Sequence, residues 1–511
     1  MQWLNQLVDE ITLRFPEGEI LIESGASPSG TYHFGHLREI ITSDAIMLEL
    51  KSRGRQARHI QFVDDLDGLR KIPANIPADF EQYLGMPLCD IPAPDGSKRS
   101  FADYFVDDFI DVAQELGIDM GVERSHKKYR SGFFVSAIER VLANVPAARQ
   151  TIESVAGRQL DEHWSPIQIM ESGRLKNRRF ISIDENAKEV VYESQKGDEQ
   201  RASYASGLVK LDWRLDWPAR WWLLKVQVEP FGRDHATKGG SYDTGLGLMD
   251  EVFDAPAPIP VPYDFINRAG DTKKMSASKG TGIEAKEVVQ VLPAELVRYF
   301  VLAYPPSKRL YFDQSVGVMR LFDEFAALLA KPNRTAQEEQ LLRLCRGPLG
   351  DRIVVSQIPF SHVVASYQSA LRDPERTLDI LSRTEYGDKI EANKDVLMHE
   401  LTFIGKWLDK WAPDEVKFDL LEDLSTVTLT AQQKDFLRKL SERVAKAPEH
   451  ADGAWFHQAI YELKDSSDLS PKDLFSTLYQ TLIGKDSGPR AGWFLSILPR
   501  EWLINRLALK A

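Results

Sequence analysis

The chain has 511 residues, which at roughly 150 residues per domain predicts three or four domains and enough length to bury at least one large core. Apolar residues make up 43%, charged residues 27% and aromatic residues 10%, values that exclude collagen, a coiled coil and general disorder. The net charge of -12 excludes a surface that attracts polyanions everywhere, so any nucleic-acid contact must come from local basic patches.

The chain contains no run of about 18 uncharged apolar residues, and acidic Asp9 and Glu10 stand where a signal peptide would be basic. We therefore expect a cytoplasmic protein with no membrane partner. The two cysteines, Cys89 and Cys345, are far apart and form no CxxC pair. This spacing predicts neither a disulfide framework nor structural zinc.

The first 63 residues read as helix, strand, Gly-rich turn, helix and strand. Apolar residues at helical spacing predict a helix over residues 4–15, and an apolar run predicts a strand over 19–23. A second helix follows the turn, with its buried face between residues 37 and 48, and residues 58–63 form the next strand candidate. This order is the first half of a nucleotide-binding α/β sheet.

The pattern continues with predicted helices over 101–116 and 133–142 and a short strand over 120–122. Alternating runs at 180–183 and 189–192 predict a β-hairpin inserted between residues 151 and 212. Strand candidates at 226–231 and 259–265 and a helix over 244–252 resume the α/β order, and helical periodicity dominates from residue 285. We expect an α/β fold: a Rossmann-type parallel-sheet domain with a small β-containing insertion, followed by an all-α C-terminal domain. The expected segments are 1–150, 151–212, 213–290 and 291–511.

A Gly/Ser/Pro turn that leads into a helix is the first candidate site. It reads GASPSGTYHFGH from residue 25 to residue 36. Glycines let the backbone approach a phosphate, a helix N-terminus presents unpaired N–H donors, and His33 and His36 project from one helix face. A triphosphate would fit there. Two other interpretations stay open for this segment alone: a capped helix with two surface histidines, or a zinc pair, which the missing cysteines disfavour.

A lysine-rich loop is the second candidate site. It reads KKMSASKG from residue 273 to residue 280, directly after a predicted strand and loop. Three lysines can neutralise the charge that develops on a pyrophosphate leaving group, and serines and glycines let the loop close. Taken alone, the segment is better explained as a solvated surface loop, and only its pairing with the first site favours the functional interpretation.

Together the two motifs resemble the signatures, of the HIGH and KMSKS type, that bracket the nucleotide site of class I aminoacyl-tRNA synthetases in the same order. Within this class the chain is similar to the class I lysyl-tRNA synthetases over most of its length. The matching strings are SPSG, HFGHLRE, FVDDLDGLRK, KLDWRLDWPARW, EPFGRDHATKGGSYDTG, KMSASKG and LFSTLYQTLIGKDSGPRAGWFL.

The resemblance implies an enzyme that uses ATP and Mg²⁺ to activate lysine as lysyl-adenylate. The lysyl group would then pass to the 2′-hydroxyl of the terminal ribose of tRNA(Lys), with no covalent enzyme nucleophile. The residues that it implies for catalysis are His33, His36 and Lys274. Those for ATP are Pro28, Gly30, His33, Gly35, His36, Met275, Ser276, Ser278 and Lys279. Those for the amino acid are Gly25, Ser27, Asp64, Trp213 and His235.

The choice of amino acid depends on the charge of the pocket. Glutamyl enzymes are the closest alternative, but they carry an arginine shortly before the SPTG-like turn, and residues 19–32 contain none here. A pocket for an ammonium group needs carboxylate or aromatic faces instead. The candidate carboxylates lie at or just beyond predicted strand ends and are Glu23, Asp64, Asp65 and Asp67. The candidate aromatic faces are Trp213 and Trp217. We expect one or two of these acids to be functional; a helix cap and ordinary core packing explain the rest.

The inserted region departs from the family pattern, which often has cysteine pairs that form a zinc knuckle. Residues 151–212 contain no cysteine, so we expect no structural zinc, and the grip of this region on the tRNA acceptor end is in doubt. Residues 291–511 correspond to the helical stem-contact and anticodon-binding region of the family, where Arg490 and Trp493 fit either tRNA contacts or core and capping roles. We expect a monomer. A paralogue that activates an amino acid without charging tRNA, or a binding protein on an inactive scaffold, remains an alternative.

Overall fold

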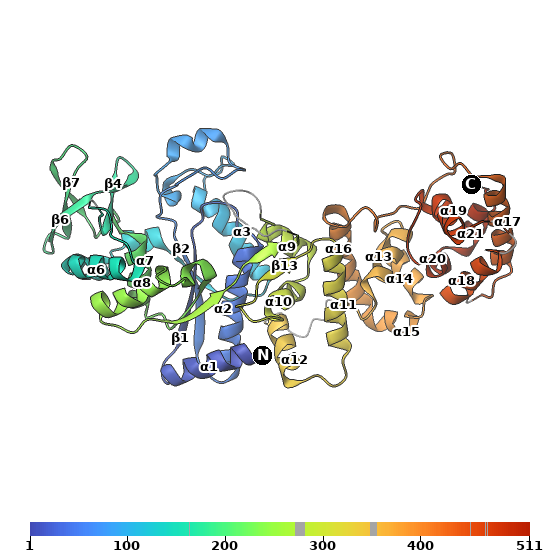
Figure 1. The fold of residues 1–511 in the computed structure, drawn as a ribbon, viewed down its shortest axis with the longest axis horizontal. Coiled ribbons are helices and arrows are strands. Elements are labelled where there is room, and N and C mark those ends of the chain that lie inside the picture. Colours follow the sequence, from blue (N-terminus) through green and yellow to red (C-terminus); the bar gives the residue numbers. More distant parts are fainter. Residues whose placement is uncertain are drawn as a thin grey trace. The chain divides into compact units, whose positions relative to one another are not determined.

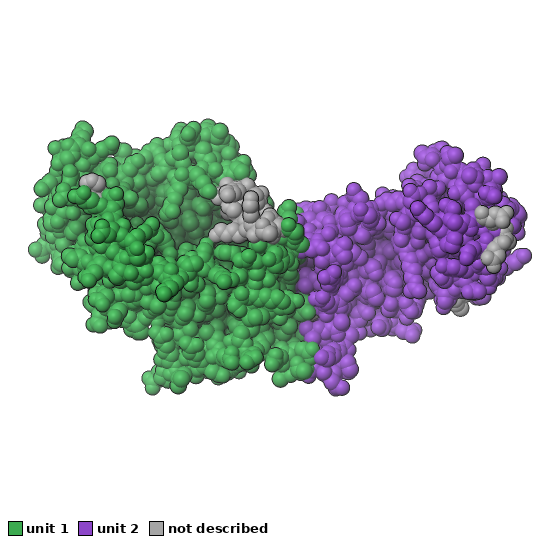
Figure 2. All heavy atoms as spheres, in the orientation of Figure 1, with its two compact units in different colours: residues 1–289, 297–312, 335–350 green, residues 290–296, 313–334, 351–511 purple. Residues whose placement is uncertain are grey.

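The computed structural model describes residues 1–162, 164–270, 282–347, 355–449, 451–464, 467 and 469–510. The chain divides into two compact units (Figure 2). Residues 1–289, 297–312 and 335–350 form the first unit, and residues 290–296, 313–334 and 351–511 form the second. Among the described helices, none has the length and apolar character needed to span a bilayer.

The centre of the first unit is a five-stranded parallel sheet in the order β11-β10-β1-β2-β3, of which Figure 1 labels β1 and β2. The strands are β1 (Ile20–Ala26), β2 (Ala57–Val63), β3 (Gly121–Arg124), β10 (Val228–Gly232) and β11 (Ile259–Tyr263). The two central strands β1 and β2 are buried along nearly their whole length, as is typical of a parallel sheet with helices on both faces. The strand order reverses between β1 and β10, and ligands of open α/β sheets bind in the crevice at such a switch point.

The Rossmann-type sheet expected from the sequence is thereby confirmed. The helices that accompany it are α1 (Gln2–Arg14), α2 (Phe34–Ser52), α3 (Phe101–Glu115), α4 (Ser125–Arg130), α5 (Val135–Ala143), α6 (Val145–Ala156), α7 (Trp213–Leu224), α8 (Ser241–Leu248), α9 (Ala285–Val291), α10 (Ala294–Leu302) and α12 (Ala336–Arg346). A short parallel pair, β12 (Ile266–Arg268) and β13 (Leu310–Phe312), follows the main sheet. The helix that starts at Phe101 begins there because Ser100 and Asp103 form a reciprocal capping box.

The inserted region is larger than the single hairpin predicted from the sequence. The expected hairpin is present as β6 (Arg179–Asp184) and β7 (Glu189–Glu193), which pair antiparallel, and β8 (Glu199–Ser203) completes their sheet. A second three-stranded sheet contains β4 (Ile167–Glu171), β5 (Arg174–Asn177) and β9 (Val209–Leu211). The short polar strands β5 and β8 lack the apolar alternation that made the hairpin legible.

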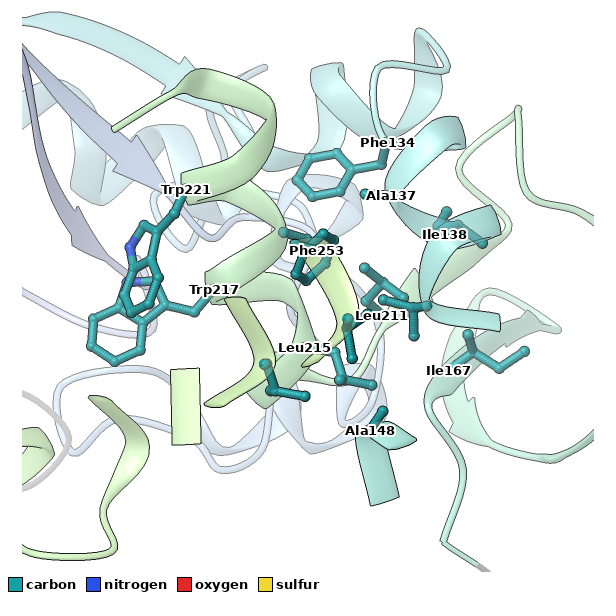
Figure 3. Packing of buried hydrophobic residues seen from close by; sticks show 14 of the residues in the cluster. Phe134, Ala137, Ile138, Ala148, Ile167, Leu211, Leu215, Trp217, Trp221 and Phe253 are labelled. Atoms are coloured by element: carbon teal, nitrogen blue, oxygen red, sulfur yellow. The ribbon is translucent and has the colours of Figure 1, made fainter. Parts of the chain in front are cut away.

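One apolar cluster joins the inserted sheets to the rest of the first unit (Figure 3). Trp217 and Trp221 of α7 pack against each other with ring centroids 4.9 Å apart. A Cβ atom on Gly245 would lie 2.6 Å from the Trp221 ring, so only glycine allows α8 to approach α7 this closely. Ile167 of β4 and Leu211 of β9 belong to the same cluster, which fixes the inserted region on α7.

The second unit contains helices and no strand among its described residues, as expected. Its helices are α11 (Val316–Ala330), α13 (Phe360–Ser369), α14 (Pro374–Ser382), α15 (Gly387–Ile390), α16 (Lys394–Lys410), α17 (Ala431–Ala445), α18 (Gly453–Glu462), α19 (Pro471–Ile483), α20 (Ala491–Ile497) and α21 (Arg500–Leu507). Trp493 stacks on His362 and packs against the apolar core of α17–α21, whereas Arg490 is exposed just before α20.

A buried ion pair ties α2 to α10. Arg298 Nη2 donates to Asp44 Oδ2 at 2.5 Å, and both side chains are at most 1% exposed. The guanidinium also donates to the carbonyl oxygens of Leu344 and Leu116. Because the pair is hydrogen-bonded on several sides, loss of one partner leaves an uncompensated buried charge.

Replacing Asp44 with alanine is expected to lower the free energy of unfolding by about 3–5 kcal/mol, because Arg298 then lacks its counter-charge. Urea unfolding followed by tryptophan fluorescence measures the loss. Arg58→Ala is the control: its pair with Glu19 has half-exposed side chains, and its loss is expected to cost less than about 1 kcal/mol. Equal losses in the two variants would contradict this interpretation.

Candidate active site

A cavity of about 370 Å³ lies at the carboxyl ends of β1 and β10, where the strand order reverses. Five chain segments contribute its walls. The lining residues are Gly25, Ala26, Ser27, His33, Gly35, His36, Glu39, Asp64, Trp213, Trp217, Arg220, Glu229, Pro230, Phe231, Gly232, Asp234, His235, Tyr263 and Phe265. The cavity therefore occupies the place at which open α/β sheets bind their ligands.

The start of α2 forms one wall of this cavity. His33 is the N-cap residue, and its Nδ1 accepts a hydrogen bond from the backbone N–H of Gly35 at 3.0 Å. The Nδ1 atom of His36 accepts the backbone N–H of His33, also at 3.0 Å. Because both Nδ1 atoms accept, each ring carries its proton on Nε2. Each imidazole therefore caps the helix through Nδ1 and keeps Nε2–H as a hydrogen-bond donor.

His36 stays neutral at physiological pH. Burial lowers the pKa of its imidazole to about 4, and the hydrogen bond with His33 opposes this only in part. The two rings lie 4.1 Å apart between centroids, and the Tyr32 ring meets His36 edge-on at 5.0 Å. The wall thus presents neutral imidazoles, which suit hydrogen-bond donation to phosphate oxygens better than transfer of a proton.

Carboxyl groups dominate the polar lining. Glu39 accepts the backbone N–H of Gly25 at 2.7 Å through Oε1 and the hydroxyl of Tyr263 through Oε2. Burial raises the pKa of Glu39 to about 7, with these hydrogen bonds opposing the shift. Burial also raises the pKa of Asp64 to about 7, opposed by the charge of Arg220. A cationic ligand would favour the ionised form of both groups.

Arg220 is the guanidinium that lines the cavity, and three acids hold it. Its nitrogens lie 3.1 Å from Asp216, 3.3 Å from Asp64 and 3.6 Å from Glu23. The Arg220 side chain is 9% exposed and stacks on the Phe62 ring at 4.3 Å. An arginine already surrounded by carboxylates is poorly placed to receive an acidic ligand.

Aromatic rings form another part of the cavity lining. Trp213 and Trp217 each meet the His235 ring edge-on, with centroids 6.2 and 5.5 Å apart. Trp217 also contacts Phe231 in an edge-to-face arrangement at 5.5 Å. These faces can pack along an aliphatic chain and attract a cation.

The structure brings together most of the described residues that the sequence indicated. Gly25, Ser27, His33, Gly35, His36, Asp64, Trp213 and His235 all line the cavity. Pro28 and Gly30 are buried in the turn between β1 and α2, outside the lining. The predicted residues Lys274, Met275, Ser276, Ser278 and Lys279 lie outside the described residues.

Of the acids weighed from the sequence, Asp65 and Asp67 point elsewhere. Asp65 accepts the backbone N–H of His126 at the start of α4 and pairs with Arg124, which is the helix-capping alternative. Asp67 pairs with buried Lys210 at 3.1 Å. Neither lines the cavity.

Sequence reasoning missed several lining residues that matter for the chemistry of the cavity. They are Glu39, Arg220, Glu229, Tyr263 and Phe265. Glu39 had a usable signal, because it follows His36 by three residues and therefore shares its helix face. Glu229 lies within a strand, where one acid in an apolar run carries no indication of what it faces.

Residues 1–344 match the family model described as tRNA synthetases class I (K). Lysine–tRNA ligase of Archaeoglobus fulgidus is 34% identical over 509 residues, which cover 99% of each chain. Lysine–tRNA ligase 1 of Methanosarcina acetivorans is 32% identical over 531 residues, covering 99% of this chain and 98% of that one.

Among solved structures, a glutamate tRNA ligase from Elizabethkingia meningosepticum covers 97% of this chain and 100% of its own, with a TM-score of 0.42 and 11% identity. That likeness is too low to carry an argument about fold or function. The family match and the full-length relatives confirm the resemblance inferred from the two motifs. The chain belongs to the class I tRNA synthetases (K).

Proposed function

We propose that this chain is a lysine–tRNA ligase, which activates lysine with ATP and transfers the lysyl group to the terminal ribose of tRNA(Lys). The observation that carries the proposal is the cavity itself, in which the imidazole-capped start of α2 and several buried carboxyl groups share one space. The imidazoles and main-chain amides suit phosphates, and the carboxyl groups suit an ammonium group. The full-length relatives named lysine–tRNA ligase support the same conclusion.

In the activation step, ATP would lie against the start of α2. His33 and His36 would donate Nε2–H to phosphate oxygens, and Pro28, Gly30 and Gly35 would shape the backbone approach. The amino acid would lie beside β1, with Gly25 and Ser27 near its backbone groups and Asp64, Trp213 and His235 around it. Its carboxylate would then attack the α-phosphorus with pyrophosphate as the leaving group, a reaction that depends on positioning and charge neutralisation.

Cations must neutralise the negative charge that develops on pyrophosphate as it leaves. We assign this role to Lys274, with Met275, Ser276, Ser278 and Lys279 as further ATP contacts, from the KMSAS motif alone. In the part of the chain that the structure describes, no three His, Cys, Asp or Glu side chains are grouped to hold a metal ion. Mg²⁺ would therefore bind mainly through ATP phosphate oxygens, as Mg²⁺ commonly does with few protein ligands. When bound, it neutralises charge on those oxygens.

The transfer step would use the 2′-hydroxyl of the tRNA terminal ribose. We propose that residues 151–212 contact the acceptor end and that residues 291–511 contact the stem and the anticodon. We also propose that the segments of the chain divide at residues 150, 212 and 290. The enzyme would be a monomer in the cytoplasm.

A glutamyl specificity is disfavoured by the charge balance of the cavity. Its guanidinium, Arg220, is held by Glu23, Asp64 and Asp216, so an acidic side chain would meet mostly carboxyl groups. Like charges brought together without water are strongly unfavourable. The tRNA-charging assay described below distinguishes the proposed enzyme from a paralogue that activates lysine without charging tRNA.

Amino-acid-dependent ATP/pyrophosphate exchange, run against all twenty amino acids, tests the proposal. Lysine is expected to support exchange and glutamate to support none above background, because the cavity favours cations. Charging of purified tRNA(Lys) is then expected with lysine. Exchange without charging would identify an activating paralogue, and no exchange with any amino acid would refute the proposal.

His33→Asn is expected to separate the two roles of the imidazole. Asparagine is a good N-cap residue, so thermal stability should stay close to wild type. The Nε2–H donor is lost, which should lower the exchange rate by about 100- to 1000-fold. His33→Ala, the comparison variant, should lose the rate and also about 1 kcal/mol of stability. Wild-type exchange by a folded His33→Asn enzyme would remove the phosphate role.

Lys274→Ala is expected to lower lysine-dependent exchange by about 100- to 1000-fold, because one charge contact to the leaving group is lost. Circular dichroism checks that the fold is intact. Lys279→Ala is the matched variant, since residue 277 is alanine where KMSKS has lysine, and it is expected to have the smaller effect. A larger loss from Lys279→Ala would move the assignment to Lys279.

A further inference from the structure

Glu229 is a cavity-lining acid with an unused hydrogen-bond acceptor. It lies in β10 and is 2% exposed. Its Oε1 accepts the indole N–H of Trp217 at 2.8 Å, whereas its Oε2 is buried and contacts no donor among the described residues. A buried acceptor without a partner typically costs about 1–3 kcal/mol, so its persistence calls for a ligand or a proton at that atom.

The other acids of the lining are already engaged. Both oxygens of Glu39 accept hydrogen bonds, from Gly25 and Tyr263. Asp64 lies within ion-pair distance of Arg220. Arg220 itself is closest to Asp216, at 3.1 Å, and no ion pair joins any described residue to Glu229. The open acceptor in this wall therefore belongs to Glu229.

Glu229 also lies at the depth that a long side chain would reach. It precedes Gly232, the last residue of β10, by three positions, or about 10 Å along a strand. Ile22 of β1 pairs with Val228 of β10, so Gly25 and Ser27 lie further toward the carboxyl end of the sheet than Glu229, where the backbone groups of an amino acid would bind. Trp217 and Phe231 flank this path with apolar ring surface. A chain of methylene groups would pass these rings and end at a carboxylate.

We propose that Glu229 binds the side-chain ammonium of the amino-acid substrate through Oε2 and thereby determines the preference for lysine. The assignment rests on the proposed function. Glu229 would act together with the acids already engaged near it, which supply a negative environment and leave the direct contact to Glu229.

The titration of Glu229 gives the proposal a signature in pH. Burial raises the pKa of Glu229 well above its usual range; Glu23 raises it further, and the Trp217 hydrogen bond and Arg220 oppose the shift. The titratable and charged groups of the lining are Glu39 of α2, Asp64 after β2, Arg220 of α7, Asp234 and His235 after β10, and Tyr263 of β11, and Glu23 of β1 and Asp216 of α7 lie behind the lining beside Arg220.

Burial therefore favours the protonated form of Glu229 in the free cavity, whereas an entering ammonium favours the ionised form. Rising pH removes the proton from Glu229 before lysine binds. The KM for lysine should accordingly fall as pH rises through about 7, the pKa of both Glu39 and Asp64, and loss of the proton from Glu229 should act in the same direction.

The test compares Glu229→Gln with Glu23→Gln in the full-length enzyme by ATP/pyrophosphate exchange. Glutamine keeps the shape of Glu229 and the acceptor for Trp217 but loses the charge. Glu229→Gln should raise the KM for lysine at least about 30-fold, leave the KM for ATP unchanged and flatten the fall of lysine KM with pH. The KM for 2-aminohexanoic acid, which is lysine without its ammonium group, should not rise.

Glu23→Gln is the matched control. Glu23 is equally buried on the neighbouring strand and faces Arg220, but it does not line the cavity. Its KM for lysine should stay within about threefold of wild type if contact, and not general charge, is decisive.

An unchanged lysine KM in folded Glu229→Gln would overturn the inference, and so would equal rises in the two variants. If Glu229→Gln does not fold, Glu229→Asp decides: a raised KM for lysine with unchanged use of 2-aminohexanoic acid supports the contact, and an unchanged lysine KM refutes it. A wild-type enzyme without lysine-dependent exchange refutes the proposed function instead.

Discussion

The site depends on one constraint: at one end of the parallel sheet, more acidic than basic side chains are buried. Glu23, Asp64 and Asp216 surround one guanidinium, and Glu39 and Glu229 lie close by without a cation of their own. Burial works against so many ionised carboxylates in one place, so the pKa values of several of them rise. The acidic part of the cavity therefore favours a cationic ligand group over an acidic one, and this preference depends on the elements that hold the acids in place.

The start of α2 connects this electrostatic site to the fold. The Nδ1 atoms of His33 and His36 satisfy backbone donors of the first turn, so these two side chains are needed to begin the helix as well as to face the cavity. One turn further on, Glu39 receives the backbone N–H of Gly25 at the end of β1. The same helix therefore positions imidazole donors, a carboxylate and the edge of the central strand relative to one another.

The inserted region shows how a small β unit can be anchored by packing and ion pairs. Its strands share an apolar cluster with α7, so the wall of the cavity and the inserted sheets have one core. Glu139 of α5 receives both Lys188 at 2.6 Å and the hydroxyl of Tyr204 at 2.8 Å. Arg178 and Glu171 form a second, bidentate pair within the insertion.

The sequence by itself was sufficient for the sheet, the main helices, the helical second unit and the turn with His33 and His36. Apolar periodicity reports which face of an element is buried, and glycines and histidines at a helix start report chemistry that depends on local backbone. The six inserted strands were only partly legible, because short polar strands such as β5 and β8 have no alternation to read.

Only the tertiary structure decided which acids face the cavity. Asp64, Asp65 and Asp67 lie in one short segment, and nothing in the sequence shows which of them faces a ligand. In the structure Asp65 caps α4, Asp67 pairs with Lys210 and Asp64 lines the cavity. Glu229 and Arg220 come from segments far from His33 along the chain, and nothing local distinguishes them from residues packed elsewhere in the core. A cavity is the space left between side chains of separate segments, so its lining depends on long-range packing that periodicity does not encode.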